Sequence, residues 1–199
     1  MDSVRYVFAL IWLVAFPILL FWLALHPFVA FWRRMGVAAT YATLVAGIVA
    51  GSALLYTLRG PLLSIEFGTG PVMWALTALA YAASIAVESQ ARKHLGIATL
   101  VGVPEVRGDA RSETLLTQGI YARMRHPRYV GATLGYVASA FLANYLFLYA
   151  ALPVFLFLVH TVVLLEEREL LDRFGDDYRA YMDRVPRYLP RLSGPPARP

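Results

Sequence analysis

The chain has 199 residues, of which 59% are hydrophobic and 16% are charged. Soluble domains carry about a quarter charged residues, so this composition indicates a membrane protein. The absence of cysteine excludes disulfides, thiolate nucleophiles and cysteine-ligated metals. The formal net charge is +5, but the basic residues flank apolar segments and form no isolated patch with aromatic residues, which argues against nucleic acid as a partner.

The first half of the chain contains three long apolar segments. A membrane-spanning helix needs roughly 20 predominantly apolar residues, and residues 4–25, 36–58 and 72–91 meet this requirement. Pro17 predicts a kink in the first segment, and Gly and Pro punctuate a predicted loop over 59–71. The second segment contains three glycines that suit close helix packing: Gly36, Gly47 and Gly51.

The second half begins with a polar stretch over 92–128. The next apolar run, 129–165, is long enough for two short spans joined by a tight turn near Asn144. From Glu166 the pattern predicts an amphipathic helix and then a Pro-rich tail. We therefore expect an all-α integral membrane protein with five transmembrane helices.

The basic residues predict the orientation of these five spans. With the N terminus outside, 16 of the 18 basic residues fall on the cytoplasmic side, and only Arg5 and Arg59 lie outside. The C terminus is then cytoplasmic, together with the two most polar segments. We expect residues 1–92 to form a three-span membrane region, and residues 93–199 to form a region that carries the chemistry at the cytoplasmic face.

A histidine–proline pair marks the start of the fourth predicted span. Pro127 suits the first turn of a helix, which places His126 at the N-cap, near free backbone N–H groups and the positive end of the helix dipole. Such a corner favours a bound anion or carboxylate. The structural alternative is an interfacial cap whose neighbouring arginines only anchor the span at the membrane surface.

Carboxylates follow the fifth predicted span directly. Glu166 has Val162, Val163 and Leu170 as its helical neighbours, so no local basic residue pairs with it. It therefore needs a partner from another segment or from a ligand. Three further acids are interpreted as structural: Glu167 and Glu169 as a solvated helix face, with Glu169 spaced to pair with Arg173, and Glu88 as a surface pair with Arg92.

The four histidines lack the spacing of metal ligands, so we expect no metal site. His160 lies at apolar depth in the fifth span, about one and a half turns before Glu166. A lone histidine at this depth is either a buried, hydrogen-bonded core residue or a group that faces a substrate.

Two motifs resemble a known family. The segments "TLLTQGIYARMRHPRYVG" and "EERELLDRFGDDYRAYMDRVPRYLP", which lie within residues 113–190, closely resemble the isoprenylcysteine carboxyl methyltransferase family and its bacterial relatives among integral-membrane methyltransferases. The chain is similar to the small prokaryotic members. The resemblance implies a bacterial or archaeal cell membrane and S-adenosyl-L-methionine in a cytoplasmic pocket, made by the loop before the fourth span and the helix after the fifth.

The resemblance also implies which residues contact the cofactor. By position they are Glu113, Thr114, Leu115, Leu116, Tyr121, His126, Pro127, Arg128, Tyr129 and Glu166. Relatives often have histidine at position 113. Arg125 or the helix N terminus at His126 suits the carboxylate of the cofactor, and Glu166 suits its ammonium or hydroxyl donors. Tyr121 and Tyr129 offer flat walls for adenine.

One position departs from the family pattern. The prenylcysteine enzymes have an arginine for the substrate carboxylate four residues before the cofactor glutamate, where this chain has Val162. A prenylcysteine carboxylate is therefore disfavoured as substrate. His160 and Thr161 are the nearest polar groups that can replace that arginine, and His160 and Arg125 are the candidate catalytic residues.

We thus expect O-, S- or N-methylation of a lipophilic small acceptor that enters sideways from the lipid bilayer. Two alternatives stay open. Membrane sterol-type reductases have a related C-terminal architecture and bind a nicotinamide cofactor, and a non-catalytic membrane protein can keep the same scaffold.

Overall fold

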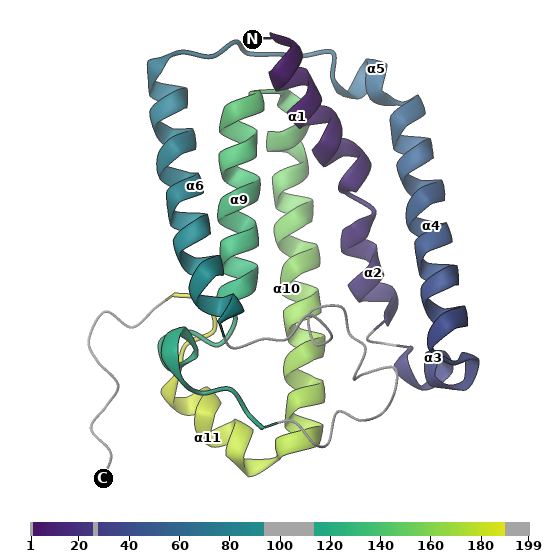
Figure 1. Cartoon of the computed structure of the whole chain (residues 1–199), viewed down its shortest axis with the longest axis vertical. Coiled ribbons are helices and arrows are strands. Elements are labelled where there is room, and N and C mark those ends of the chain that lie inside the picture. The colour runs from purple at the N-terminus through teal and green to yellow at the C-terminus, as the bar shows by residue number, and fades with distance from the viewer. Residues whose placement is uncertain (1, 26–27, 94–113, 190–199) are drawn as a thin grey trace.

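The computed structural model describes residues 2–25, 28–93 and 114–189. These residues are almost entirely helical and contain no strand, and one isolated β-bridge joins Glu66 to Tyr145. The long helices run side by side as a bundle (Figure 1). The N terminus and the turn between α9 and α10 lie at its upper end, whereas α3, α11 and the start of α9 lie at its lower end.

The helices of the described residues include one at each expected span, together with shorter helices that were not expected. In chain order they are α1 (Asp2–Ala15), α2 (Ile18–Leu25), α3 (Val29–Met35), α4 (Val37–Thr57), α5 (Arg59–Leu62), α6 (Pro71–Arg92), a 3₁₀ helix (Gly119–Ala122), α9 (Pro127–Ala143), α10 (Leu146–Phe174) and α11 (Asp176–Arg184). The predicted loop over 59–71 differs in one respect, because it begins with the short helix α5.

In the part of the chain that the structure describes, four helical segments are long and apolar enough to cross a membrane: Ser3–Leu25, Val37–Thr57, Pro71–Arg92 and Leu146–Phe174. The all-α membrane class is therefore confirmed. The remaining predicted span is α9, whose 17 residues reach about 26 Å and lie at the short limit for a transmembrane helix. The count of five spans stays a prediction.

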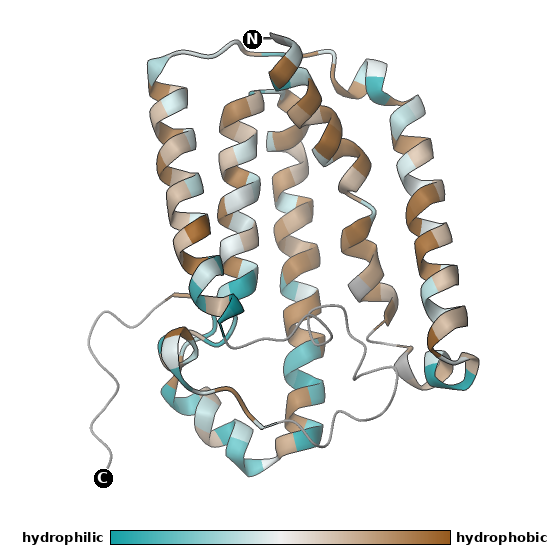
Figure 2. Cartoon of the chain, viewed as in Figure 1, coloured by the Kyte–Doolittle hydropathy of each residue, from teal (hydrophilic) through white to brown (hydrophobic). Residues whose placement is uncertain are grey.

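Helix α10 is longer than the sequence suggests. It runs through Glu166 to Phe174 as one helix of 29 residues and ends at Gly175, whose φ is 52°. The prediction of a short fifth span followed by a separate amphipathic helix is therefore wrong: the charged segment continues the same helix beyond its apolar part. Figure 2 shows this change, because the lower part of α10 and α11 carry most of the hydrophilic colour in that region.

Pro17 divides the first apolar segment into α1 and α2, which confirms the predicted kink. The hydroxyl of Ser52 in α4 donates a hydrogen bond of 2.6 Å to the carbonyl of Val14 beside the break. A Cβ atom on Gly51 would lie 3.1 Å from Pro17, whereas one on Gly47 would meet no atom within 4 Å. Of these two glycines, Gly51 is therefore the one that close packing requires.

The most extensive packing joins α6 to α9. The hydroxyl of Ser84 donates a 2.8 Å hydrogen bond to the carbonyl of Gly131, and Tyr81 and Ser139 share a hydrogen bond of 2.7 Å. A Cβ atom on Gly131 would lie 2.6 Å from the side chain of Glu88, so this glycine permits the close approach. Glu88 forms the predicted surface pair with Arg92. This packing fixes the position of α9 and therefore of its N-terminal corner.

A buried arginine closes the upper end of the bundle. The side chain of Arg5 is 4% exposed, pairs with Glu66 and donates hydrogen bonds of 3.1 and 2.9 Å to the carbonyl of Ala143. Asn144 follows in the left-handed conformation, with φ of 58°, and makes the predicted turn. Arg5 thus satisfies a carbonyl at the C terminus of α9 that has no partner within the helix.

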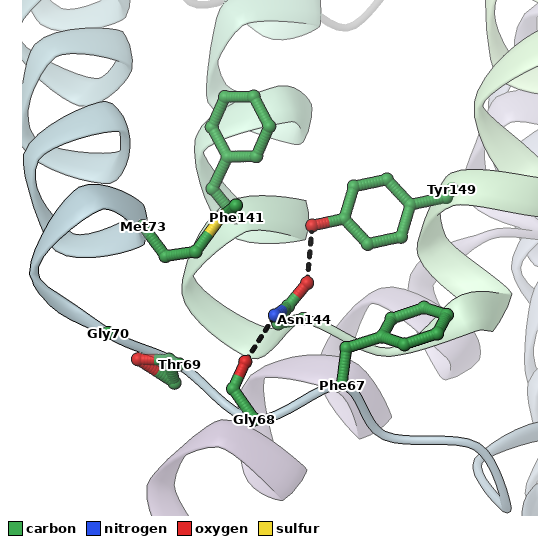
Figure 3. Close-up of a pocket in the computed structure, with 8 residues that line it drawn as sticks. All are labelled: Phe67, Gly68, Thr69, Gly70, Met73, Phe141, Asn144 and Tyr149. Carbon is green, nitrogen blue, oxygen red and sulfur yellow. Dashed lines mark hydrogen bonds between the residues drawn. The ribbon is translucent and has the colours of Figure 1, made fainter.

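A cavity of about 690 Å³ also opens at the upper end, between the start of α6 and the turn after α9 (Figure 3). Its lining is largely apolar, with Phe67, Met73 and Phe141. Asn144 bonds to the carbonyl of Gly68 and accepts a hydrogen bond of 2.6 Å from Tyr149. This cavity is at the opposite end of the bundle from the histidine–proline corner, and the residues predicted to bind a cofactor do not line it.

Candidate functional site at the lower end of the bundle

The loop before α9 pairs with the segment that follows α11. His126 is the N-cap residue of α9 and Pro127 occupies its first turn, as predicted. The backbone N–H of Arg125 donates to the carbonyl of Pro186 at 2.9 Å, and that of His126 donates to Arg187 at 3.1 Å. Two stretches that are about 60 residues apart in the sequence are therefore joined by main-chain hydrogen bonds at this corner.

Glu167 occupies the centre of the cluster. It is 4% exposed, and its carboxylate accepts hydrogen bonds from Arg125, His126 and Arg187. The shortest contact to Arg187 is 2.6 Å. The sequence interpretation of Glu167 as part of a solvated helix face is therefore wrong, because tertiary packing turns this side of α10 toward α9 and the C-terminal segment. Glu169 is half-buried.

Arg125 uses four hydrogen bonds on the protein itself. Its Nε and Nη2 atoms donate to Glu167 at 3.0 and 2.8 Å, and Nη1 donates to the carbonyls of Met182 and Val185 at 2.9 and 2.6 Å. The side chain is 7% exposed. These contacts make Arg125 the link between α10 and the end of α11. Its role as a partner of the cofactor carboxylate stays a prediction.

His126 lies between the two adjacent glutamates. Its Nε2 atom is 3.1 Å from Glu167, and its Nδ1 atom is 3.8 Å from Oε2 of Glu166. If the neutral ring donates its Nε2 proton to Glu167, Nδ1 is an acceptor that faces a second acceptor on Glu166. A hydrogen-bond donor placed between Nδ1 and Oε2 would satisfy both atoms.

Two buried oxygens of this cluster have no hydrogen-bond partner among the described residues. One is Oε2 of Glu166, and the other is the hydroxyl of Tyr178, a residue that is 1% exposed. Buried polar atoms are nearly always hydrogen-bonded, so such atoms suggest a missing partner. Within residues 2–25, 28–93 and 114–189, no three histidine or acidic side chains group closely enough to hold a metal ion.

Buried tyrosines line the same end of the bundle. Burial raises the pKa of Tyr121 to about 12, while the nearby guanidinium of Arg128 partly opposes this shift. Burial also raises the pKa of Tyr178 and Tyr181 above the ordinary value. Tyr181 donates a hydrogen bond of 2.7 Å to the carbonyl of Tyr121, which fixes the 3₁₀ helix against α11. All three phenols are therefore neutral at physiological pH.

The other predicted residues fall around this cluster. Leu116 packs with Tyr121 on one side, and Leu115 packs with Tyr178 on the other. The ring of Tyr129 lies 5.9 Å from that of His126. Thr114 is exposed and Arg128 is half-buried. Glu113 lies outside the described residues.

His160 is exposed on α10, and its Nδ1 atom is 2.7 Å from the hydroxyl of Tyr188. The alternative of a buried core histidine is therefore wrong, although the ring is hydrogen-bonded. Val162 is 4% exposed, so the position of the family arginine is part of the apolar packing here. The neighbouring hydroxyl of Thr161 bonds to the carbonyl of Phe157 in its own helix.

The sequence analysis gave Glu167 no role in the site and did not name Arg187, Tyr178, Tyr181 and Tyr188. The family motif that follows the two glutamates could have identified four of them, because it contains Tyr178, Tyr181, Arg187 and Tyr188. Hydrogen bonding to Glu167 raises the pKa of Arg187, so the pair stays charged across the physiological range.

Part of this chain is similar to known proteins. A family model described as phospholipid methyltransferase matches residues 72–177, which include all of α6 but its first residue, the histidine–proline corner and both glutamates. The chain is 36% identical over 72 residues to methanethiol S-methyltransferase 1 of Bradyrhizobium diazoefficiens. It is 34% identical over 83 residues to the nickel-cobalt-cadmium resistance protein NccN of Alcaligenes xylosoxydans xylosoxydans.

These matches are partial. They cover 36% and 42% of this chain, but only 24% and 39% of the two relatives. No solved structure matches the chain significantly.

Proposed function

Because the chain belongs to the phospholipid methyltransferase family, we propose that it transfers a methyl group from S-adenosyl-L-methionine to a small lipophilic acceptor. A membrane methyltransferase agrees with the resemblance in the sequence and with the apolar helices of the bundle. The cofactor supplies an electrophilic methyl group on a sulfonium. The residues of this chain bind the cofactor, orient it and keep it near the membrane surface.

The observation that carries the proposal is the unsatisfied oxygen of Glu166. Its Oε2 atom is buried, has no hydrogen-bond partner among the described residues and lies 3.8 Å from Nδ1 of His126. The ammonium of the methionine portion, or a ribose hydroxyl, is a donor of the kind that both atoms need. Glu167 cannot take this role, because its oxygens already hold Arg125, Arg187 and His126.

The remaining groups of the cofactor also fit the chemistry of the corner. The first turn of α9 presents backbone N–H groups and the positive end of the helix dipole, which favour the cofactor carboxylate. Tyr121 is a neutral, buried phenol beside Leu116, and Tyr129 lies next to His126. We assign these two rings to the adenine, as aromatic surfaces that place no charge against it.

We place this site at the cytoplasmic face. The lower end of the bundle carries the cluster, and the positive-inside rule assigns 16 of the 18 basic residues to that side when the N terminus is outside. This orientation gives the site access to a cofactor made in the cytoplasm, in a bacterial or archaeal cell membrane.

The acceptor is proposed to be lipophilic because α10 exposes apolar side chains beside the site, including Phe157 at 68% and Leu164 at 45%. The buried Val162 offers no cation to a substrate carboxylate. A relative named for S-methylation of a small thiol supports a small acceptor as well. Phospholipids stay a candidate class through the family description.

Calorimetry with S-adenosylhomocysteine on the detergent-purified chain tests the proposal. The wild-type chain should bind it, and Glu166→Gln should weaken binding by roughly 10- to 100-fold, the range for a lost hydrogen bond to a charged group. Asp176→Asn is the matched control, because Asp176 is an exposed acid paired with Arg179 on α11. It should bind like wild type.

Two results would decide against the proposal. Binding of NADPH instead of S-adenosylhomocysteine would favour a nicotinamide-dependent reductase. Binding of neither molecule, in a chain that unfolds cooperatively, would favour a non-catalytic scaffold.

A further inference from the structure

His160 lies within an apolar, exposed strip of α10. Its helical neighbours Leu156, Phe157 and Leu164 are 43%, 68% and 45% exposed, and His160 is itself exposed among them. A polar side chain on a surface that faces lipid costs free energy, so its presence there suggests a functional group.

Tyr188 connects this strip to the histidine–proline corner. Its hydroxyl is 2.7 Å from Nδ1 of His160, and the two ring centroids are 6.0 Å apart. On its other side the ring of Tyr188 lies 6.5 Å from the ring of His126. The half-buried Tyr188 therefore has the lipid-facing histidine on one side and the proposed cofactor site on the other.

We propose, on the basis of the function proposed above, that His160 is the catalytic base of the acceptor site and that Tyr188 is its positioning residue. The acceptor is then an uncharged, membrane-soluble molecule with a weakly acidic S–H or phenolic O–H group. It enters from the bilayer along the apolar strip of α10.

The orientation of the imidazole determines the chemistry. When Nδ1–H of His160 donates to the oxygen of Tyr188, Nε2 carries the free lone pair. The S–H proton of the acceptor moves to Nε2, and the acceptor sulfur forms a bond to the methyl carbon. The bond from that carbon to the sulfonium sulfur breaks, and its electron pair stays on that sulfur as a thioether. The imidazolium then releases its proton to water.

The class of acceptor follows from the type of base. An imidazole suits groups with a pKa of about 8–10, such as thiols and phenols, and is too weak for aliphatic alcohols. A carboxylate acceptor is already ionised near neutral pH and needs a cation in place of a base. The charged groups that act on Tyr188 are Arg187, Glu167 and Arg125. Both arginines donate to the carboxylate of Glu167, so neither is left for a substrate carboxylate.

The phenol of Tyr188 brings no negative charge to His160. Burial raises the pKa of Tyr188, while Arg187 beside it opposes that shift. The phenol therefore stays protonated, and it can serve as a hydrogen-bond partner of His160 without carrying charge into the apolar strip.

Methyl transfer to octanethiol tests the base. His160→Gln should bind S-adenosylhomocysteine like wild type but should transfer methyl about 100-fold more slowly, the low end for general-base catalysis. Its remaining rate should rise about tenfold per pH unit below the pKa of the thiol, since only solution thiolate then reacts. Added imidazole should restore part of the rate. Tyr188→Phe should show a smaller loss and a shifted pH profile, and Asp172→Asn, an exposed acid on α10, should match wild type.

A second readout requires no turnover. Diethyl pyrocarbonate should modify the exposed His160, and methyl octyl sulfide, the product of transfer to octanethiol, should protect it in the presence of S-adenosylhomocysteine. Mass spectrometry of the modified peptide reports this protection.

Four outcomes would overturn the proposal: an unchanged pH–rate profile in His160→Gln, an absence of protection, faster methylation of octanoate than of octanethiol and 4-hexylphenol, or loss of S-adenosylhomocysteine binding in His160→Gln alone. If the wild-type chain itself does not bind S-adenosylhomocysteine, the failure belongs to the proposed function.

Discussion

Glu167 and Arg125 form the buried ion pair that joins the lower ends of α9, α10 and α11. Oε1 of Glu167 accepts hydrogen bonds of 3.0 and 2.8 Å from Nε and Nη2 of Arg125, and the two side chains are 5% and 7% exposed. Because Arg125 also holds the carbonyls of Met182 and Val185, the pair reinforces the main-chain hydrogen bonds that join the loop before α9 to the segment after α11.

Removing this carboxylate should destabilise the fold strongly. Glu167→Ala leaves the guanidiniums of Arg125 and Arg187 without their buried counter-ion, and breaking a buried pair in this way costs about 3–5 kcal/mol. Denaturant unfolding in detergent measures the change in the free energy of unfolding. Asp176→Asn should change that free energy by less than about 0.5 kcal/mol, because its ion pair is exposed. Equal stability of the two variants would refute the structural role of Glu167.

The upper end should affect stability without affecting the proposed cofactor site. Arg5→Met removes the buried hydrogen bonds to Ala143 and the ion pair with Glu66 and should lower the free energy of unfolding by about 2 kcal/mol. Binding of S-adenosylhomocysteine should stay as in wild type, because Arg5 contacts the C-terminal end of α9 whereas His126 caps its N-terminal end. A variant that is stable but no longer binds would mean that the two ends are coupled.

Alkaline pH should destabilise the lower end through its buried phenols. The pKa of Tyr121 is raised from 10 to about 12, so the folded state resists ionisation that the unfolded state allows. Stability is therefore retained below pH 10 and is lost as the pH rises from 10 to 12. Tyr121→Phe should lose less stability than wild type over this interval, as measured by unfolding at each pH. Identical pH dependence in the two proteins would contradict the burial of this hydroxyl.

The orientation can be tested with single cysteines, because the chain has none of its own. Ser64 follows α5, which lies at the upper end, and Asp177 belongs to α11, which lies at the lower end. Both residues are exposed, so each can be replaced by cysteine. A membrane-impermeant maleimide should label position 64 in intact cells, and should label position 177 only after permeabilisation. The reverse pattern would place the candidate site outside the cell.

Much of the fold can be predicted from the sequence because its signals are local. Apolar length places α4 and α6 within one residue of their observed bounds, and His126, Pro127 and Asn144 mark the ends of α9 through capping chemistry. Local signals also explain the error in α10. A change from apolar to charged residues marks the membrane boundary, but it does not break a helix that contains no Gly or Pro before Gly175 in that region.

The sequence indicates that Glu166 needs a distant partner, but it does not reveal that Glu167 is buried and paired. Glu166 and Glu167 differ by about 100° around the axis of α10, and which of them meets Arg125 depends on the rotation of that helix in the bundle. The partners of Glu167 come from residues 41 and 42 positions earlier and 20 positions later in the chain. No helical spacing encodes such contacts, and the same is true of Arg5 with Glu66.

A structure of the complex with S-adenosylhomocysteine tests the proposed site itself. The proposal requires an ammonium or hydroxyl group of the bound molecule within about 3.2 Å of Oε2 of Glu166, and next to Nδ1 of His126. A molecule bound elsewhere, for example in the cavity at the upper end, with Glu166 bonded only to protein groups, would contradict it.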